Sequence, residues 1–543
     1  MANTAITVAH RERCHPERSE GVSRKQSKDL VFARNSSGPS ENCFARMNKP
    51  THILLPLPPP LRLMLMPFAA LLLFLLVVPA FCQVTFTEST LPAPPGARVI
   101  RLSAAPGDFT EPSIAVNPND PRQLIGAYQV NASVAYSRDA GQTWTIAAGT
   151  APADYKISGD VSVTYDNQGH AFLCYIAFDK LGTENYWAHG ATRNGIFVRR
   201  SLDGGQTWDK DAAVVIAHPS DPNIPFEDKP YIVADTTHSR YAGNLYIGWT
   251  EFTLDKSIML FSRSTDAGKT WSTPIKISTR DGLPRDDNGA VEGFTGAVGS
   301  DGTLYMVWSD ISGVVLAVSK DGGLSVSHSR TIIQTGPSYF DPSSVGRGNG
   351  FPQIAIDPRS HKLFVTWADF TNGDLDVFSA TSTDKGKHWS KPVRVNDDPL
   401  HNGRDQFFQW LAVDPVDGSE SVIFCDRRAD PGNRSYYLTL ARSTDGGQTF
   451  KNYAWNTQPS DPKDVFMGDY MGITAYGGKV YGIWARTATP EEQSVIQSRE
   501  GDTATNSTKA DAQTSLDAPK TPQLSKPKGL FVEVGLADFS HPR

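Results

Sequence analysis

The sequence predicts an all-β protein built from a repeated unit, and three observations carry this prediction. The 543 residues include 45 Gly and 38 Pro, more than a helical bundle tolerates, together with 11 Trp, 17 Tyr and 26 Phe. Such a composition is typical of many short strands joined by turns. An eight-residue pattern recurs six times, and a short apolar strand pattern recurs seven times. These repeats predict one large domain of similar sheets.

The eight-residue pattern runs from a serine through Asp and Gly to a terminal aromatic residue, as in Ser201–Trp208, and its copies recur at intervals of 55 to 64 residues. In a tight turn of this composition the Asp carboxylate accepts backbone N–H bonds and the glycine adopts a positive φ. The aromatic ring can pack beneath the turn. We therefore expect scaffold roles for the six aspartates, Asp139, Asp203, Asp266, Asp321, Asp384 and Asp445.

Strand patterns precede each copy of the motif, and a motif with its strands forms one repeated unit. We expect the first strand of each unit to be the innermost strand of its sheet. Seven such strands are expected, at 112–116, 161–165, 230–233, 294–298, 352–356, 410–413 and 471–475. The seventh unit continues through 479–484 and then lacks its outer strands. We expect residues 529–536 to supply the third strand and residues 97–102, from the other end of the domain, to supply the fourth. Shared strands of this kind leave no long open edge.

The motif resembles the Asp-box, or bacterial neuraminidase repeat, of sialidase-superfamily β-propellers, and the resemblance covers nearly all of the chain after residue 82. It implies a β-propeller whose box turns join the two outer strands of each blade, on the face opposite the active site. The seven innermost strands favour seven blades. Six blades are the alternative, because the sialidases of the family close with six.

The front of the chain predicts export. Residues 1–46 lack apolar periodicity, and we interpret them as a gene-model extension or a disordered segment. Residues 47–82 have the basic start, apolar run and small residues of a signal peptide. A lipid anchor at Cys82 is disfavoured, because Phe81 is bulky where a lipobox needs a small residue. We expect a secreted or periplasmic protein without a stable membrane span.

The remaining sequence, 83–543, predicts a single propeller with a disordered insertion at about 487–526. A net charge of −6 gives no support for nucleic-acid binding. No metalloprotease, phosphate-loop or nucleophile-elbow motif is present. We expect a monomer in which Cys174 and Cys425 are buried free thiols.

A site is expected where the innermost strands begin and the second strands end, because these positions converge on one face of such a ring. The residues there are mostly acidic, and an arginine sector comes from the last units. For any single carboxylate a turn-capping role is the ordinary interpretation, whereas the whole group favours a ligand-binding mouth. Crowded carboxyls have raised pKa values and suit Ca²⁺ as a hard cation. The predicted binding residues are Glu111, Asp228, Arg404, Asp426, Arg427, Arg428 and Asp469.

The family resemblance implies catalytic roles for Glu292, Tyr470 and Asp160, as the glutamate–tyrosine nucleophile pair and the acid/base aspartate. It also implies three arginines that hold a sialic acid carboxylate. Thr110 and Asp310 stand at or beside two of these arginine positions, which argues against sialic acid as the substrate. We expect a glycoside hydrolase-like protein acting on an extracellular glycan or glycoconjugate. The alternatives are a non-catalytic propeller that binds glycan or protein and a metal-assisted polysaccharide lyase.

Overall fold

The computed structural model describes residues 91–129, 131–150, 154–183, 187–219, 224–456, 459–489, 491–492 and 529–541. The expected 1–46 segment, the 47–82 signal peptide with Cys82, and nearly all of the 487–526 insertion lie outside the described residues. Within the described part the chain forms seven four-stranded antiparallel sheets, so the prediction of an all-β propeller with seven blades is confirmed.

Blades 1 to 6 are simple meanders in chain order, each running from the innermost to the outermost strand. Blade 1 contains β2 (Ser113–Val116), β3 (Leu124–Tyr128), β4 (Ser133–Ser137) and β5 (Thr145–Ile146). Blade 2 contains β6 (Ile157–Tyr165), β7 (Ala171–Phe178), β8 (Asn194–Ser201) and β9 (Ala213–His218). Blade 3 contains β10 (Phe226–Ala234), β11 (Leu245–Phe252), β12 (Ser257–Ser264) and β13 (Ile275–Lys276).

The next three blades repeat this order. Blade 4 contains β14 (Glu292–Val298), β15 (Leu304–Asp310), β16 (Gly313–Ser319) and β17 (Arg330–Ile333). Blade 5 contains β20 (Gln353–Ile356), β21 (Leu363–Asp369), β22 (Asp376–Ser382) and β23 (Val393–Arg394). Blade 6 contains β24 (Gln406–Val413), β25 (Glu420–Asp426), β26 (Tyr437–Ser443) and β27 (Lys451–Ala454). A separate hairpin, β18 (Tyr339–Phe340) with β19 (Gly348–Asn349), lies between blades 4 and 5 in the chain.

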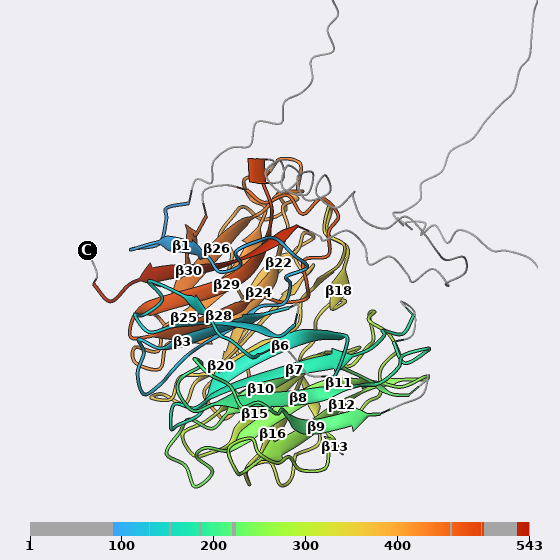
Figure 1. Ribbon diagram of the computed structural model, residues 1–543. Helices are drawn as coiled ribbons and strands as arrows, with labels where there is room; N and C mark the ends of the chain where they lie inside the picture. The colour runs from blue at the N-terminus through green and yellow to red at the C-terminus, as the bar shows by residue number, and fades with distance from the viewer. Residues whose placement is uncertain are drawn as a thin grey trace, which may run out of the picture. The chain divides into compact units, whose positions relative to one another are not determined.

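Blade 7 combines both ends of the domain. Its strands are β28 (Gly472–Tyr476), β29 (Lys479–Thr487) and β30 (Leu530–Asp538), with β1 (Arg98–Arg101) as the outermost. Arg98 pairs with Leu536 and Arg101 with Glu533. Figure 1 shows β1, in blue, beside β30, in red. The strands that the sequence analysis assigned to 97–102 and 529–536 therefore share one sheet.

Neighbouring blades are in contact all the way round, because each innermost strand contacts the next and β28 contacts β2. Hydroxyl groups on the innermost strands also join one blade to the next. Ser113 Oγ accepts a bond from Val163 N at 3.1 Å, and Ser162 Oγ accepts one from Ile232 N at 3.2 Å. These bonds satisfy backbone N–H groups at the centre, which have no further strand to pair with.

The six boxes form the turns between the third and fourth strands of blades 1 to 6, as the resemblance implied. In the first box, Asp139 Oδ1 accepts the Thr143 N–H at 2.9 Å and Asp139 Oδ2 accepts the Thr143 hydroxyl at 2.6 Å. The other five aspartates accept bonds from the residue four positions later in the same way. The Trp208 Nε1–H donates to Gly205 O at 3.1 Å, which holds the ring against its own turn.

The core lies between the blades. The second strands supply its largest buried side chains, among them Trp249, Trp308, Trp367 and Trp484. Cys174 and Cys425 are free and buried, as predicted, and burial raises the pKa of each thiol. Among the described residues, the structure shows no helix of the length and apolarity needed to span a bilayer.

Candidate functional site

The functional candidates come from an irregularity shared by the innermost strands. In four blades the register between the first and second strands shifts near the start, and an extra residue is inserted. Such bulges re-aim side chains, and they are common beside functional sites. Asp160 and Lys229 occupy equivalent bulge positions with φ of 47° and 48°, and Glu111 in blade 1 has φ of 51°. Left-handed conformations of residues other than glycine cost free energy and cluster at functional sites.

Two adjacent positions of this irregular segment supply most of the charged groups at the centre. The first position is the one that Glu111 occupies in blade 1, Asp160 in blade 2 and Lys229 in blade 3. The second lies one residue earlier in the chain and is occupied by Asp228 in blade 3, Glu292 in blade 4 and Asp469 in blade 7. The loop before β14 adds Asp286, and the β18–β19 hairpin with its connecting loop adds Tyr339, Arg347 and Asn349. We call these ten residues the central cluster. They are Glu111, Asp160, Asp228, Lys229, Asp286, Glu292, Tyr339, Arg347, Asn349 and Asp469.

Asp469 is the hub of the cluster. Its carboxylate accepts a short bond from Lys229 Nζ, and it accepts Arg347 Nε–H at 3.1 Å and Asn349 Nδ2–H at 3.2 Å. Burial alone would raise the pKa of Asp469, but Arg347 and Lys229 lower it to about 2. Asp469 is therefore ionised at any physiological pH, and its charge holds the buried Lys229 and the partly exposed Arg347 in place.

Three carboxyls from blades 1 to 3 form a chain beside this hub. Glu111 lies within hydrogen-bond reach of Asp160, and Asp160 within reach of Asp228. Burial, with the charge of Asp469, raises the pKa of Glu111 to about 7. Burial also raises the pKa values of Asp160 and Asp228 well above their ordinary range. Carboxyls that share protons in this way supply general acids near neutral pH.

The approach of Glu111 to Asp469 depends on a glycine. The Asp469 N–H donates to Glu111 Oε1 at 3.2 Å. Gly468, just before it, has φ of +93°, and a Cβ there would lie 2.8 Å from the Glu111 backbone nitrogen. Only glycine permits both this conformation and this contact. Blades 7 and 1, which adjoin where the ring closes, are thereby brought together at the site.

Glu292 lies in the cluster, but its tyrosine partner differs from the one that the resemblance implied. The Tyr339 hydroxyl donates a short bond to Glu292 Oε2. Burial, with the charge of Asp286, raises the pKa of Glu292 well above its ordinary range. The tyrosine beside this glutamate therefore comes from the β18–β19 hairpin, and Tyr470 is engaged elsewhere.

Tyr470 belongs to an aromatic group on the propeller axis. Its hydroxyl donates to Val161 O at 3.1 Å, and its ring lies 5.6 Å from that of Trp410. Trp410 in turn lies 6.0 Å from Tyr231, which comes from a blade on the far side of the ring. These three rings bring side chains from blades 3, 6 and 7 together at the centre of the ring. Burial raises the pKa of the Tyr470 phenol well above its ordinary range.

The predicted arginine sector does not join the cluster through any of its described hydrogen bonds or ion pairs. Arg428 pairs with Asp426, Nε to Oδ2 at 2.6 Å, and bonds Asn452 in the outermost strand of blade 6. Arg427 is fully buried and donates to Ser343 O in the loop that carries Arg347. Arg404 N donates to Asn402 Oδ1 at 2.7 Å, and the guanidinium interacts with Asp430. The side chains at the end of the second strand of blade 6 are thus engaged within that blade and with the loop before β19.

Four residues of the central cluster, Lys229, Tyr339, Asn349 and Asp286, were not predicted from the sequence. Lys229 had a usable signal, because it precedes Pro230 as Glu111 precedes Pro112 at the start of an innermost strand. The other three lie in loops outside the repeat, and no pattern in the sequence relates them to the blades.

Among the described residues, two groups of acidic or imidazole side chains have the spacing of metal ligands. Asp228, Asp286 and Glu292 form one within the central cluster. His218, Glu227 and Glu251 form the other, at the junction of blades 2 and 3. In the second group His218 Nε2 lies 2.6 Å from Glu227 Oε1, and Trp249 Nε1–H donates to Glu227 Oε2 at 2.5 Å. Burial, with the neighbouring Glu227, raises the pKa of Glu251 to about 7.

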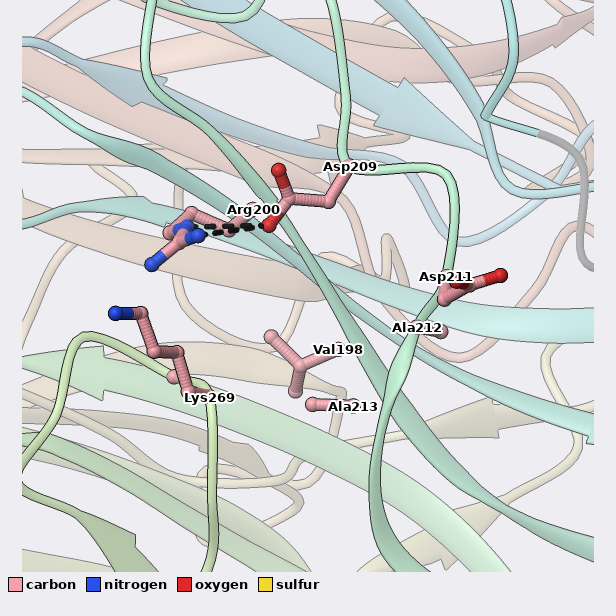
Figure 2. A pocket seen from close by; sticks show the side chains of 8 residues that line it. Val198, Arg200, Asp209, Asp211, Ala212, Ala213 and Lys269 are labelled. Carbon is pink, nitrogen blue, oxygen red and sulfur yellow. Dashed lines mark hydrogen bonds and ion pairs between the residues drawn. The ribbon is translucent and has the colours of Figure 1, made fainter.

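A surface pocket lies at the outer edge of the ring, away from this cluster. Figure 2 shows Arg200 paired with Asp209, and Lys269 from the box turn of blade 3 on the same side. None of its lining residues belongs to the central cluster. Its Arg200 and Asp209 already pair with each other, so it offers weaker candidates than the central cluster does.

The fold and the site together define a seven-blade β-propeller with a buried acidic centre. No protein-family model matches the chain, and no curated protein matches it. Similar solved structures include a Hadza microbial sialidase, with 16% identity and a TM-score of 0.41 over 67% of this chain and 70% of that one. An α-L-arabinofuranosidase from Fusarium graminearum has 13% identity and a TM-score of 0.41 over 62% of this chain and 91% of that one. The endosialidase of phage phi92 has 10% identity and a TM-score of 0.43 over 82% and 69%.

Proposed function

We propose that the protein is an exported, glycan-active β-propeller that cleaves glycosidic bonds by general acid catalysis at the central cluster. The observation that carries this proposal is the pair Glu111 and Asp469, whose pKa values move in opposite directions, to about 7 and about 2. A protonated carboxyl beside an ionised one is the arrangement with which glycosidases protonate a leaving group.

In this proposal the pair Glu111–Asp160 is the proton donor. Asp160 is its more exposed member, at 7%, and Glu111 lies deeper. A proton given up by Asp160 can be replaced from Glu111 without passing through bulk water. The ionised Asp469 holds Lys229 and Arg347 in place beside these carboxyls.

The charges also indicate the class of glycan. Both cations of the cluster, Lys229 and Arg347, are already paired with carboxylates of the protein. An incoming carboxylate would therefore have to displace an internal partner, which costs several kcal/mol in a buried site. We propose a neutral or cationic glycan as the substrate. In this proposal the hydrogen-bonded pair of Glu292 and Tyr339 orients the bound sugar.

The experiment is a glycoside panel assay on purified protein from residue 83 onward. Aryl glycosides and neutral polysaccharides are screened for release of chromophore or reducing ends, and kcat is compared with that of Glu111→Gln and Asp160→Asn. Removal of a general acid lowers kcat by about 10²- to 10⁴-fold. The matched control is Asp301→Asn, an exposed carboxylate that pairs with Lys385 outside the cluster.

The pH profile gives a second test of the same proposal. Because Glu111 must be protonated to resupply Asp160, kcat should fall as the pH rises past about 7. Glycan binding without turnover, unchanged in both variants, would instead identify a non-catalytic binding propeller.

A further inference from the structure

We propose that Asp228, Asp286 and Glu292 form a binding site for one divalent oxygen-liganding cation, of the Ca²⁺ class. The inference does not depend on the proposed glycosidase activity. Ligand oxygens of these three side chains lie within 4.8 Å of one another. Asp286 comes from the loop before β14, Glu292 from the start of β14 and Asp228 from the start of β10, so the site joins blades 3 and 4.

The two oxygens of Glu292, like those of Asp286, differ in a way that is typical of metal ligands. Glu292 Oε2 accepts the Tyr339 hydroxyl, and Asp286 Oδ2 accepts Arg347 Nη1–H. The other oxygen of each carboxylate, Glu292 Oε1 and Asp286 Oδ1, is buried and accepts no hydrogen bond from the described residues. In metal sites an outer group commonly holds one atom of a ligand while the other faces the ion. Glu292 Oε1 has only the ammonium of Lys229 near it, at 3.4 Å, and Asp286 Oδ1 has neither a donor nor a cation among the described residues. A buried oxygen without a donor is otherwise costly.

The charge balance of the ion-pair network points to a divalent ion. Lys229 pairs with Asp228, Glu292 and Asp469, and Arg347 pairs with Asp286 and Asp469. Four carboxylates therefore face two cations, which leaves two negative charges. Two protons or one divalent cation would neutralise them.

Lys229 does not by itself satisfy the three ligands. Its Nζ lies 3.4 Å from Glu292 Oε1 and 3.8 Å from Asp228 Oδ2, while its short bond goes to Asp469. Asp286 Oδ1 has no cation among its described ion pairs. Carboxylate oxygens without sulfur or imidazole favour a hard cation, and Ca²⁺ tolerates irregular coordination completed by water or hydroxyl groups.

The test uses the purified chain after chelator treatment, with Ca²⁺ and Tb³⁺ as the probes. Ca²⁺ should bind once per chain in calorimetry, raise the thermal midpoint, and release about two protons when titrated in buffers of different ionisation enthalpy. Tb³⁺ should show luminescence sensitised by the adjacent Tyr339, and Ca²⁺ should displace it.

The variants locate the site. Asp286→Asn and Glu292→Gln should each weaken Ca²⁺ binding at least tenfold, with circular dichroism confirming that both are folded. The matched control is Asp287→Asn, because Asp287 is the next residue, its side chain is 42% exposed and it pairs with Arg285. Absence of Ca²⁺ and Tb³⁺ binding at millimolar concentration in the folded wild-type protein would overturn the proposal. So would equal affinity in Asp286→Asn and Asp287→Asn. Glycosidase activity plays no part in these readouts, so their failure leaves the proposed function standing.

Discussion

Lys229 and Asp469, which are 240 residues apart in the chain, form a buried ion pair between blades 3 and 7. Burial alone would lower the pKa of Lys229, but Asp469 and the neighbouring carboxylates raise it well above its ordinary range. The pair therefore remains charged inside the protein. It links the first half of the ring to the blade that closes it.

Replacing Lys229 with Met should destabilise the fold strongly. Removing one partner of a buried pair leaves an uncompensated charge and typically costs about 3 to 5 kcal/mol. Equilibrium unfolding in urea measures the loss. Lys385→Met removes an exposed partner of Asp301 and should change the free energy of unfolding by less than about 1 kcal/mol. Equal effects of the two substitutions would show that the buried pair contributes little.

Trp208→Ala should destabilise blade 2 without affecting the central cluster. The ring is partly buried and holds its box turn through the Gly205 carbonyl. Loss of a packed tryptophan costs on the order of 3 kcal/mol. Thermal unfolding measures the stability, and Ca²⁺ or glycan titration at a permissive temperature measures the site. A large loss of affinity in folded Trp208→Ala would contradict the scaffold role of the boxes.

Glu420 should make stability fall as the pH rises. It is fully buried, and burial raises its pKa from 4.5 to about 7. The folded state then holds a proton that the unfolded state releases, so stability is greatest below pH 4.5 and declines until about pH 7. A shift of this size corresponds to about 3 kcal/mol. Glu420→Gln, compared with wild type at pH 5 and pH 8 in urea, should be relatively more stable at pH 8. A difference between the two proteins that does not vary with pH would refute this account.

The protein should be a poor sialidase. A sialoside carries a carboxylate, and the two cations of the cluster are already paired with acidic side chains. Release of a chromophore from an aryl sialoside should therefore be slow in the wild type. Fast release that is abolished in both Tyr470→Phe and Glu292→Gln would show that sialic acid is the substrate, and that Tyr470 acts despite its bond to Val161 O.

The sequence by itself determined the architecture. The repeat made the box turns and the innermost strands recognisable, because each blade packs against its neighbours in the same way and so has the same local sequence pattern. The sequence has seven innermost-strand patterns but six boxes. This difference predicted seven blades, with the last blade completed by strands from both ends of the domain. The acids Glu111, Asp160, Asp228, Glu292 and Asp469 were found because they occupy corresponding positions at the starts of innermost strands.

Only the tertiary structure decided which charges meet. A bulge and a positive φ turn Lys229 to the centre. Neither feature can be predicted from the periodicity of the strand. Tyr339 and Arg347 come from a hairpin outside the repeat, so nothing in their local sequence relates them to Glu292 or Asp469. Asp426 and Arg428 share the acidic and basic character of the site but pair with each other in blade 6. Local pattern determines strands and turns because these are short-range, whereas the partner of a buried charge depends on contacts between residues far apart in the chain.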